Sequence, residues 1–199
     1  MIKFKVLLIG ILIMQLNSSC DEKFATTEME NNFTTEQIED LKKIRDFFEN
    51  QICDGEDDNF KNCFTKMLPE LIEFGWQPIL EKVDYNRQKD LYESISQSTF
   101  NEIWEFQKIT YPENESGHKS IASKYNGAYQ QYLTELGKNN KRIKKYVEQL
   151  KAAGDFESMG LLQQNINKNP NEFDLNDANI QLLISVHYLT QNDQQKRNE

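Results

Sequence analysis

Residues 34–53 read TTEQIEDLKKIRDFFENQIC and predict the helical character of the chain. Thr34, followed three positions later by Gln37, matches a capping box, in which two side chains satisfy free N–H groups at a helix start. Apolar side chains then recur every three or four residues, at Ile38, Leu41, Ile44, Phe48 and Ile52. This spacing places them on one face of an amphipathic helix. We therefore expect a helix over residues 34–52 that packs by this face against a core.

The same spacing continues along the chain and predicts further helices. They are expected at about 58–71, 76–83, 86–108, 119–136, 139–153, 155–168 and 174–190. Residues 111–117, which hold Pro112 and Gly117, are expected to form a loop. Eight Gly and four Pro in 199 residues are few for a turn-rich β fold, and no strong strand pattern competes. We therefore predict an all-α, single-domain bundle of seven or eight helices over residues 34–190.

The first twenty residues, MIKFKVLLIGILIMQLNSSC, are built like an export signal. Lys3 and Lys5 form a basic start, and residues 6–14 form an apolar run that only Gly10 interrupts. A run of this length cannot cross a membrane as a helix, which takes about 20 apolar residues. It fits the apolar part of a signal peptide, of about 7–15 residues, and small polar residues precede Cys20. We therefore expect this segment to direct export.

Residues 16–20, LNSSC, resemble the lipobox of a bacterial lipoprotein signal. Asn17 stands where the strict pattern has Leu, and such relaxed boxes are similar to those of Bacteroidetes lipoproteins. The resemblance implies that residues 1–19 are removed and that Cys20 becomes a lipid-bearing N-terminus. It also implies a place in the cell envelope, at the outer membrane facing the periplasm or at the cell surface. The alternative is an ordinary cleaved signal, which would leave a soluble secreted protein.

Two segments outside the predicted bundle are polar and lack a helical period. Residues 20–33 are acidic, and we expect them to form a flexible tether between the lipid and the domain. Residues 191–199 are expected to form a polar tail. Several acyl chains on Cys20 would hold the domain firmly, because one chain gives only marginal membrane binding.

Acidic residues gather in the N-terminal part of the chain. The sequence has 32 Asp and Glu against 23 Lys and Arg, for a net charge of −9. Loss of Lys3 and Lys5 with the signal would bring the net charge to −11. Residues 20–60 hold 13 acids and 4 bases. Nucleic acid is therefore not expected as a partner, because binding it requires a basic surface. An acidic face attracts basic protein surfaces, although the charge could also serve solubility alone.

Cys53 and Cys63 are expected to form a disulfide. Cys20 is assigned to the lipid, and disulfides persist outside the cytoplasm. The two cysteines flank the turn between the first two predicted helices, so the chain can bring them together there. Closing this loop would stabilise the fold by roughly 2.5–3 kcal/mol in the chain-entropy model. The alternative is a pair of buried free thiols.

The sequence shows no catalytic or metal-binding pattern. Its two histidines, His118 and His187, lack the surroundings of a known catalytic motif. A calcium loop that began at Asp54 would need Gly at its sixth position and Glu at its twelfth. The chain has Asn59 and Thr65 there. We therefore expect a protein that is not an enzyme and that holds no cofactor.

The turn between the two cysteines is the first candidate binding surface. Four of the five residues 54–58 in this turn carry carboxylates: Asp54, Glu56, Asp57 and Asp58. We expect them to bind a protein partner with a basic surface. The second candidate surface is the basic stretch over residues 138–151, which could meet anionic lipid or the acids of a partner.

Together these features are typical of a non-enzymatic envelope lipoprotein that binds another protein. Small, acidic, disulfide-stapled lipoproteins resemble immunity or inhibitor proteins, which neutralise a toxin or a hydrolase in the periplasm. One alternative is an accessory or structural lipoprotein of an envelope complex. Another is a helical lipoprotein that binds a small ligand in an aromatic pocket. That pocket would be lined by residues from among Trp104, Tyr125, Tyr129 and Tyr132.

Overall fold

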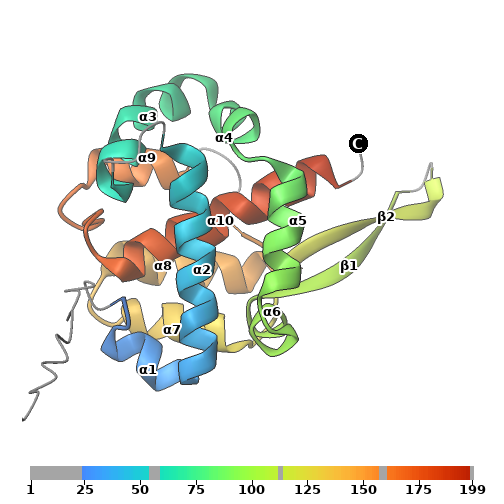
Figure 1. The fold of residues 1–199 in the computed structure, drawn as a ribbon, viewed down its shortest axis with the longest axis horizontal. Helices are drawn as coiled ribbons and strands as arrows, with labels where there is room; N and C mark the ends of the chain where they lie inside the picture. Colours follow the sequence, from blue (N-terminus) through green and yellow to red (C-terminus); the bar gives the residue numbers. More distant parts are fainter. Residues whose placement is uncertain (1–23, 54–58, 112–113, 157–160, 198–199) are drawn as a thin grey trace, which may run out of the picture.

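The computed structural model describes residues 24–53, 59–111, 114–156 and 161–197. These residues form ten helices and one two-stranded antiparallel sheet (Figure 1). The elements are α1 (Thr27–Asn32), α2 (Thr35–Ile52), α3 (Phe60–Phe74), α4 (Gln77–Lys82), α5 (Tyr85–Ser94), α6 (Gln97–Ile103), β1 (Trp104–Tyr111), β2 (Asn114–Ser123), α7 (Ala128–Leu136), α8 (Lys141–Ala153), α9 (Leu161–Lys168) and α10 (Ala178–Lys196). The fold is therefore mostly helical, as expected, with one hairpin added.

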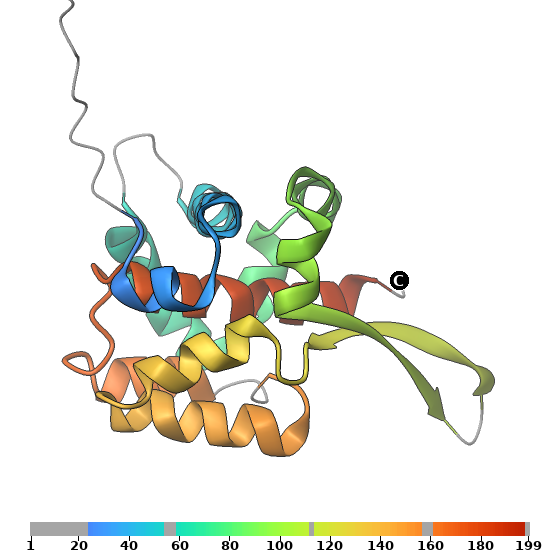
Figure 2. The ribbon, with the colours of Figure 1, turned by 90° about the horizontal axis from the view of Figure 1, so that it is seen from below.

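Helix α10 is the central element of the fold. Figure 2 shows it between a layer that holds α2 and α5 and a layer that holds α7 and α8. Every residue from Ile180 to Asp193 is buried except the half-buried Gln181. Its apolar side chains point in all directions, as in a helix that is covered on every side. No helix in the described part of the chain is long and apolar enough to cross a membrane.

The C-terminal end of α10 differs from the expected polar tail. The helix continues to Lys196, and Asn192 and Asp193 are fully buried. Asn192 donates a hydrogen bond to Gln88 of α5 at 2.7 Å, and Arg197 binds both carboxylate oxygens of Asp193 at 2.6 Å. Polar side chains can be buried when they find such partners. These partners are distant in sequence or lie one helical turn away, so composition alone did not reveal the burial.

The N-terminal end of the domain also differs from the sequence-based expectation. Residues 24–33, which the sequence places in the tether, pack on the body and include α1. Met29 is fully buried. Asn31 and Asn32 donate hydrogen bonds of 2.8 Å to the carboxylate of Glu135 on α7. The packed domain therefore begins close to Cys20.

The predicted helix over 34–52 is confirmed in detail. Thr34 and Gln37 form the expected capping box at the start of α2. α8 also matches its predicted range, and it ends at Gly154, whose φ of 73° suits the left-handed position after a helix. The last helix starts at a cap on Asp177, three residues after the predicted start at residue 174.

Residues 86–136 depart most from the prediction. The expected helix over 86–108 is divided into α5 and α6 and gives way to β1 at Trp104. Part of the expected loop and the start of the next helix are replaced by β2, so the prediction was wrong over these residues, while the fold as a whole is mostly helical. The two strands pair in antiparallel register, with Trp104 opposite Ser123 and Lys108 opposite Lys119. Figure 1 shows this hairpin projecting away from the helical body.

Candidate functional site

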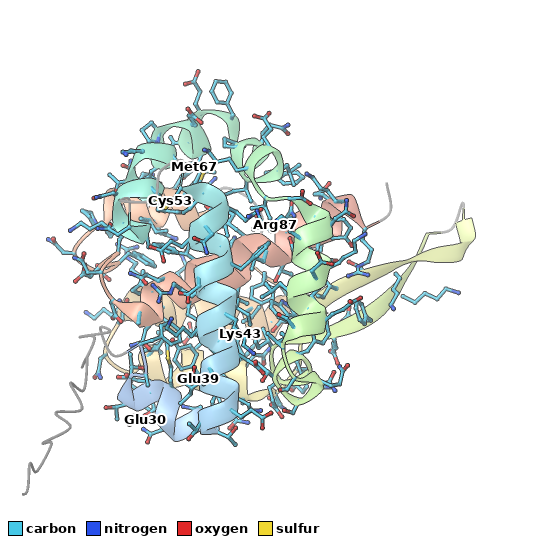
Figure 3. The ribbon with its side chains drawn as sticks, in the orientation of Figure 1. Glu30, Glu39, Lys43, Cys53, Met67 and Arg87 are labelled. Carbon is cyan, nitrogen blue, oxygen red and sulfur yellow. A yellow bond between two sulfur atoms is a disulfide. The ribbon has the colours of Figure 1, made fainter. Side chains whose placement is uncertain are left out.

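The expected disulfide joins the end of α2 to the first turn of α3. Cys53 caps α2, and Cys63 is buried on α3, with 5.1 Å between their Cα atoms. Figure 3 shows Cys53 at the end of α2, beside α3. The four acids Asp54, Glu56, Asp57 and Asp58 lie outside the described residues, between Cys53 and the α3 cap Asn59. The described part thus provides a covalently fixed base for the acidic turn, and binding by the turn itself stays a prediction.

A polar cleft of about 430 Å³ lies beside this base. Its lining includes Phe24 at the start of the described chain, Arg45 of α2, and Asn59 and Lys61, which follow the acidic turn. The guanidinium group of Arg45 lies 5.1 Å from the centre of the Phe24 ring and donates to Glu49 at 3.2 Å. The described domain therefore begins at the same cleft at which the described chain resumes after the acidic turn.

Cys20 lies outside the described residues, so its lipid stays a prediction. The position of Cys20 in the chain nevertheless limits its distance from the described domain. Four residue steps separate Cys20 from Phe24, which is buried. An extended chain spans at most about 3.5 Å per residue, so this link reaches about 14 Å. If Cys20 carries the lipid, the cleft and the base of the acidic turn would lie close to the membrane.

The hairpin of β1 and β2 lies on the other side of the body. Both Figure 1 and Figure 2 show α1 and the hairpin near opposite ends of the central helix. The base of the hairpin is fixed: Trp104 is fully buried, and its indole N–H donates to Thr190 of α10 at 2.8 Å. Gln194 donates to the carbonyl of Ile121 at 2.8 Å. Beyond this base the exposed residues Gln107 and Lys108 lead away from the core.

An exposed aromatic side chain stands where the hairpin leaves the body. Phe106 is 44% exposed, and its ring centre lies 5.5 Å from that of buried Phe100. The ammonium of Lys119 lies 3.9 Å from the centre of the Phe106 ring, and the guanidinium carbon of Arg197 lies 4.7 Å from it. Cations at these distances are attracted to the face of an aromatic ring. We refer to Phe106, Lys108, Lys119 and Arg197 as the hairpin patch.

The basic stretch that the sequence singled out forms the outer face of α8 and the turn before it. Its exposed members are Lys138, Lys141, Arg142, Lys144, Lys145 and Lys151. Arg142 lies 3.6 Å from Glu172, and Lys151 donates to Thr134 at 2.8 Å. Neither partner belongs to the acidic N-terminal third of the chain. This face is a second basic surface, separate from the hairpin patch.

His187 is buried among polar partners in the centre of the molecule. Its Nδ1 lies 2.9 Å from the hydroxyl of Tyr146, and its Nε2 lies 3.0 Å from Nε2 of Gln191. Burial lowers the pKa of His187 to about 3, so the ring is neutral near pH 7. A fully buried neutral ring with these contacts has a structural role in α10.

The aromatic pocket expected for a small ligand does not form as a unit. Trp104, Tyr129 and Tyr132 are fully buried in the packed core, whereas Tyr125 lies on the surface with 63% of its area exposed. The hydroxyl of Tyr132 donates to Asn179 at 2.9 Å. These side chains therefore contribute to packing, and the structure does not bring Tyr125 to the other three.

Sequence reasoning missed the hairpin patch because it assigned Trp104 and Phe106 to a helix. A strand signal is present in hindsight. Residues 104–111, WEFQKITY, are rich in aromatic and β-branched side chains and are followed by Pro112 and Asn114. The separation of Lys108 from Lys119 in sequence also hid their pairing, which requires the register of the hairpin.

Comparison with known proteins adds no relative to this description. The chain matches no protein-family model, and no curated protein or solved structure matches it.

Proposed function

We propose that this chain is a non-enzymatic, lipid-anchored envelope protein that binds another protein. The observation that carries the proposal is the placement of the hairpin. It projects from the side of the body opposite α1, while the chain that leads to Cys20 starts beside the cleft at Phe24 (Figures 1 and 2). An anchor at Cys20 would then hold one side at the membrane and present the hairpin outward.

The outer part of the hairpin is not required by the core, which supports a role in binding. Its base is held by Trp104 and Ile121, both fully buried. An isolated two-stranded hairpin is only marginally stable in water, so the part beyond the base contributes little to folding. A projecting element of this kind suits contact with a partner.

The finer form of the proposal is an immunity or inhibitor protein that neutralises a toxin or hydrolase in the periplasm. Position supports this role, because an anchored inhibitor stays where the toxin arrives. The acidic turn, on the disulfide-fixed base at Cys53 and Cys63, is the proposed contact for a basic partner. Electrostatic attraction would speed the encounter of the two proteins. An accessory lipoprotein of an envelope complex is the alternative within the same class.

A shortened hairpin tests the proposal directly. Gln107 pairs with Ser120 in the register, so an Asn-Gly turn can replace residues 108–119 and keep the base. Capture experiments with envelope extract should recover a specific partner with the full domain and lose it, or retain much less, with the shortened one. A matched variant neutralises the turn through Asp54→Asn, Glu56→Gln, Asp57→Asn and Asp58→Asn. If both variants keep the partner, neither surface binds it.

The anchor and the immunity role have separate tests. Lipid on Cys20 predicts a mature N-terminus at that residue with acyl mass, and its loss in Cys20→Ala. The immunity role predicts that cells lacking the gene become sensitive to neighbouring kin. If cells lacking the gene stay insensitive to neighbouring kin, the immunity role is wrong, although a binding role is still possible.

A further inference from the structure

The outer face of α8 carries a row of exposed lysines. The helix turns four apolar or aromatic side chains toward the core: Ile143, Tyr146, Val147 and Leu150. Residues three or four positions apart lie on the same face of a helix, so four lysines form a row on the other side: Lys141, Lys144, Lys145 and Lys151. We refer to these four lysines as the α8 patch. The row is about 15 Å long, at about 1.5 Å per residue.

One exposed acid, Glu148, stands within this row. No ion pair joins Lys141, Lys144 or Lys145 to any acid in the part of the chain that the structure describes. Lys151 donates to the hydroxyl of Thr134, which is neutral. Four lysines and one acid leave the described face with an excess of three positive charges.

The acids on the two flanks of the patch each have a cation of their own. On one flank, the carboxylate of Glu172 lies 3.6 Å from the guanidinium group of Arg142. On the other flank, the positive charge of Lys138 acts on the carboxylate of Glu135. Each flank therefore holds one cation and one acid, and neither flank cancels the excess charge of the row.

Further acids lie beyond the two ends of α8. Asp155 turns toward α10, where Gln194 donates to its carboxylate at 2.8 Å, and Glu157 lies outside the described residues. Three more acids line a separate cleft of about 240 Å³ at the turn before α8: Glu28, Asp174 and Asp177. Because this cleft adjoins the start of the helix, the substitutions that test the patch are placed further along it, at Lys144 and Lys145.

The lysines of the patch repel one another. Lys141 and Lys145 are four positions apart, and like charges at this spacing destabilise a helix slightly. The row therefore does not contribute to the stability of α8. An anionic group placed over it would reduce the repulsion.

We propose that the α8 patch binds an acidic segment of a partner protein. The inference goes beyond the proposed function, which places its contacts on the hairpin and on the acidic turn. About five residues of an extended chain cover a row of about 15 Å, so a short run of carboxylates would meet the lysines one after another. Complementary charge of this kind speeds the encounter of two proteins and favours one partner over others.

Two other anionic partners fit the position and charge of the patch less well. Phe24, from which the chain leads back to Cys20, lies against Arg45 of α2. Figure 2 shows α2 and α8 in layers on opposite sides of α10, so an anchor at Cys20 would hold the α2 layer closer to the membrane than the patch. Nucleic acid would meet the long-range repulsion of a chain with a net charge of −9. Both partners therefore serve as outcomes in the test.

The test measures binding of a fluorescein-labelled oligoglutamate peptide to the full mature chain at low salt. The double variant Lys144→Glu/Lys145→Glu should bind about tenfold more weakly or not at all. Lys144→Gln/Lys145→Gln removes the charge without reversing it and should bind about threefold more weakly. The control Arg87→Glu/Lys89→Glu makes the same change of charge on exposed residues of α5, in the opposite layer, and should stay within about twofold of the parent.

Unfolding in denaturant separates lost binding from lost folding. Lys144→Glu/Lys145→Glu should be at least as stable as the parent, because it removes like-charged neighbours of Lys141. Weaker peptide binding by a variant of unchanged or higher stability would then come from the charge of the patch.

Several results would overturn the proposal. They are absence of peptide binding to the parent, binding by Lys144→Gln/Lys145→Gln that equals the parent, and an equal loss in the α5 control. Preferential binding of the parent to phosphatidylglycerol vesicles or to a single-stranded RNA of matched charge would also overturn it. The proposed function fails separately, when the shortened hairpin captures an envelope partner as well as the full domain does.

Discussion

Helix α10 and the projecting hairpin both carry many polar residues, yet they use them in opposite ways. In α10 most polar side chains up to Asp193 are buried and several form hydrogen bonds within the fold, as Asn192 does with Gln88 and Thr190 does with Trp104. In the hairpin, Gln107, Lys108 and Lys119 face solvent beyond the packed base. The difference separates polar residues that are buried in the fold from polar residues that remain at the surface. Substitutions in the two regions should therefore affect different measurements.

Trp104 lies at the boundary between the two regions and should show the largest effect. Trp104→Ala removes a fully buried side chain and leaves the hydroxyl of Thr190 without its donor. The free energy of unfolding should fall by about 3–5 kcal/mol in denaturant titrations. Phe106→Ala, two positions along the same strand and 44% exposed, is the matched control and should cost about 1 kcal/mol or less. Equal losses would mean that the boundary between body and hairpin is misplaced.

The disulfide should give the next largest effect. Cys53→Ser/Cys63→Ser should lower the free energy of unfolding by about 2.5–3 kcal/mol, because the unfolded chain loses a constraint. Capture of an envelope partner through the hairpin should stay unchanged, since the two sites belong to different elements. A reducing agent should reproduce the loss in the parent and leave the double variant unaffected. If reduction leaves the free energy of unfolding of the parent unchanged, the disulfide does not stabilise the fold.

The buried ring of His187 predicts how stability in α10 depends on pH. Burial lowers its pKa to about 3 in the folded protein, against 6.5 for the free side chain. Below pH 6.5 the unfolded chain therefore binds a proton that the folded chain does not, and the free energy of unfolding falls. The loss is about 1.4 kcal/mol per pH unit, or about 2 kcal/mol between pH 6.5 and about pH 5.

The control for this pH effect is His187→Gln, which keeps a polar side chain and does not titrate. Its free energy of unfolding should vary about 2 kcal/mol less than the parent over the same window. The window stops near pH 5 because burial raises the pKa values of Asp155 and Asp193. As the pH falls further, the folded state takes up protons there first, so these groups act in the opposite direction. Parallel profiles for parent and variant would contradict a buried neutral histidine.

Local signals predicted the parts of the fold that local interactions determine. The capping box of Thr34 and Gln37, the apolar face of α2 and the stop of α8 at Gly154 are each contained within a few residues. The pairing of Cys53 with Cys63 followed from compartment and spacing, and it spans one turn. The residues that form each of these features lie close together in the chain, so their physical causes could be identified from the sequence alone.

The missed features depend on contacts between distant residues. Asp40 of α2 accepts hydrogen bonds of 2.8 Å from the backbone N–H of Ser96 and from the hydroxyl of Thr99. It thereby helps to start α6 at a place where the periodicity of residues 86–108 predicts an unbroken helix. The burial of Asn192 and the pairing of Lys108 with Lys119 likewise require partners that the sequence does not place nearby. The strand signal of residues 104–111 is present in the sequence, but the assembly of the hairpin patch requires the register of the two strands.

The substitution with the smallest expected effect on stability is also the sharpest test of the comparison between α10 and the hairpin. Lys108→Glu replaces a like-charged pair across the strands with an opposite pair to Lys119 and should stabilise the hairpin by about 0.2–1 kcal/mol. The same substitution should weaken capture of an envelope partner that binds through the hairpin. Lys141→Glu on α8 changes the charge equally and should alter neither measurement by much. Higher stability together with weaker binding would mean that Lys108 is retained for a partner at a cost to the fold. A variant that loses stability and binding together would instead place Lys108 among the residues that hold the hairpin in shape.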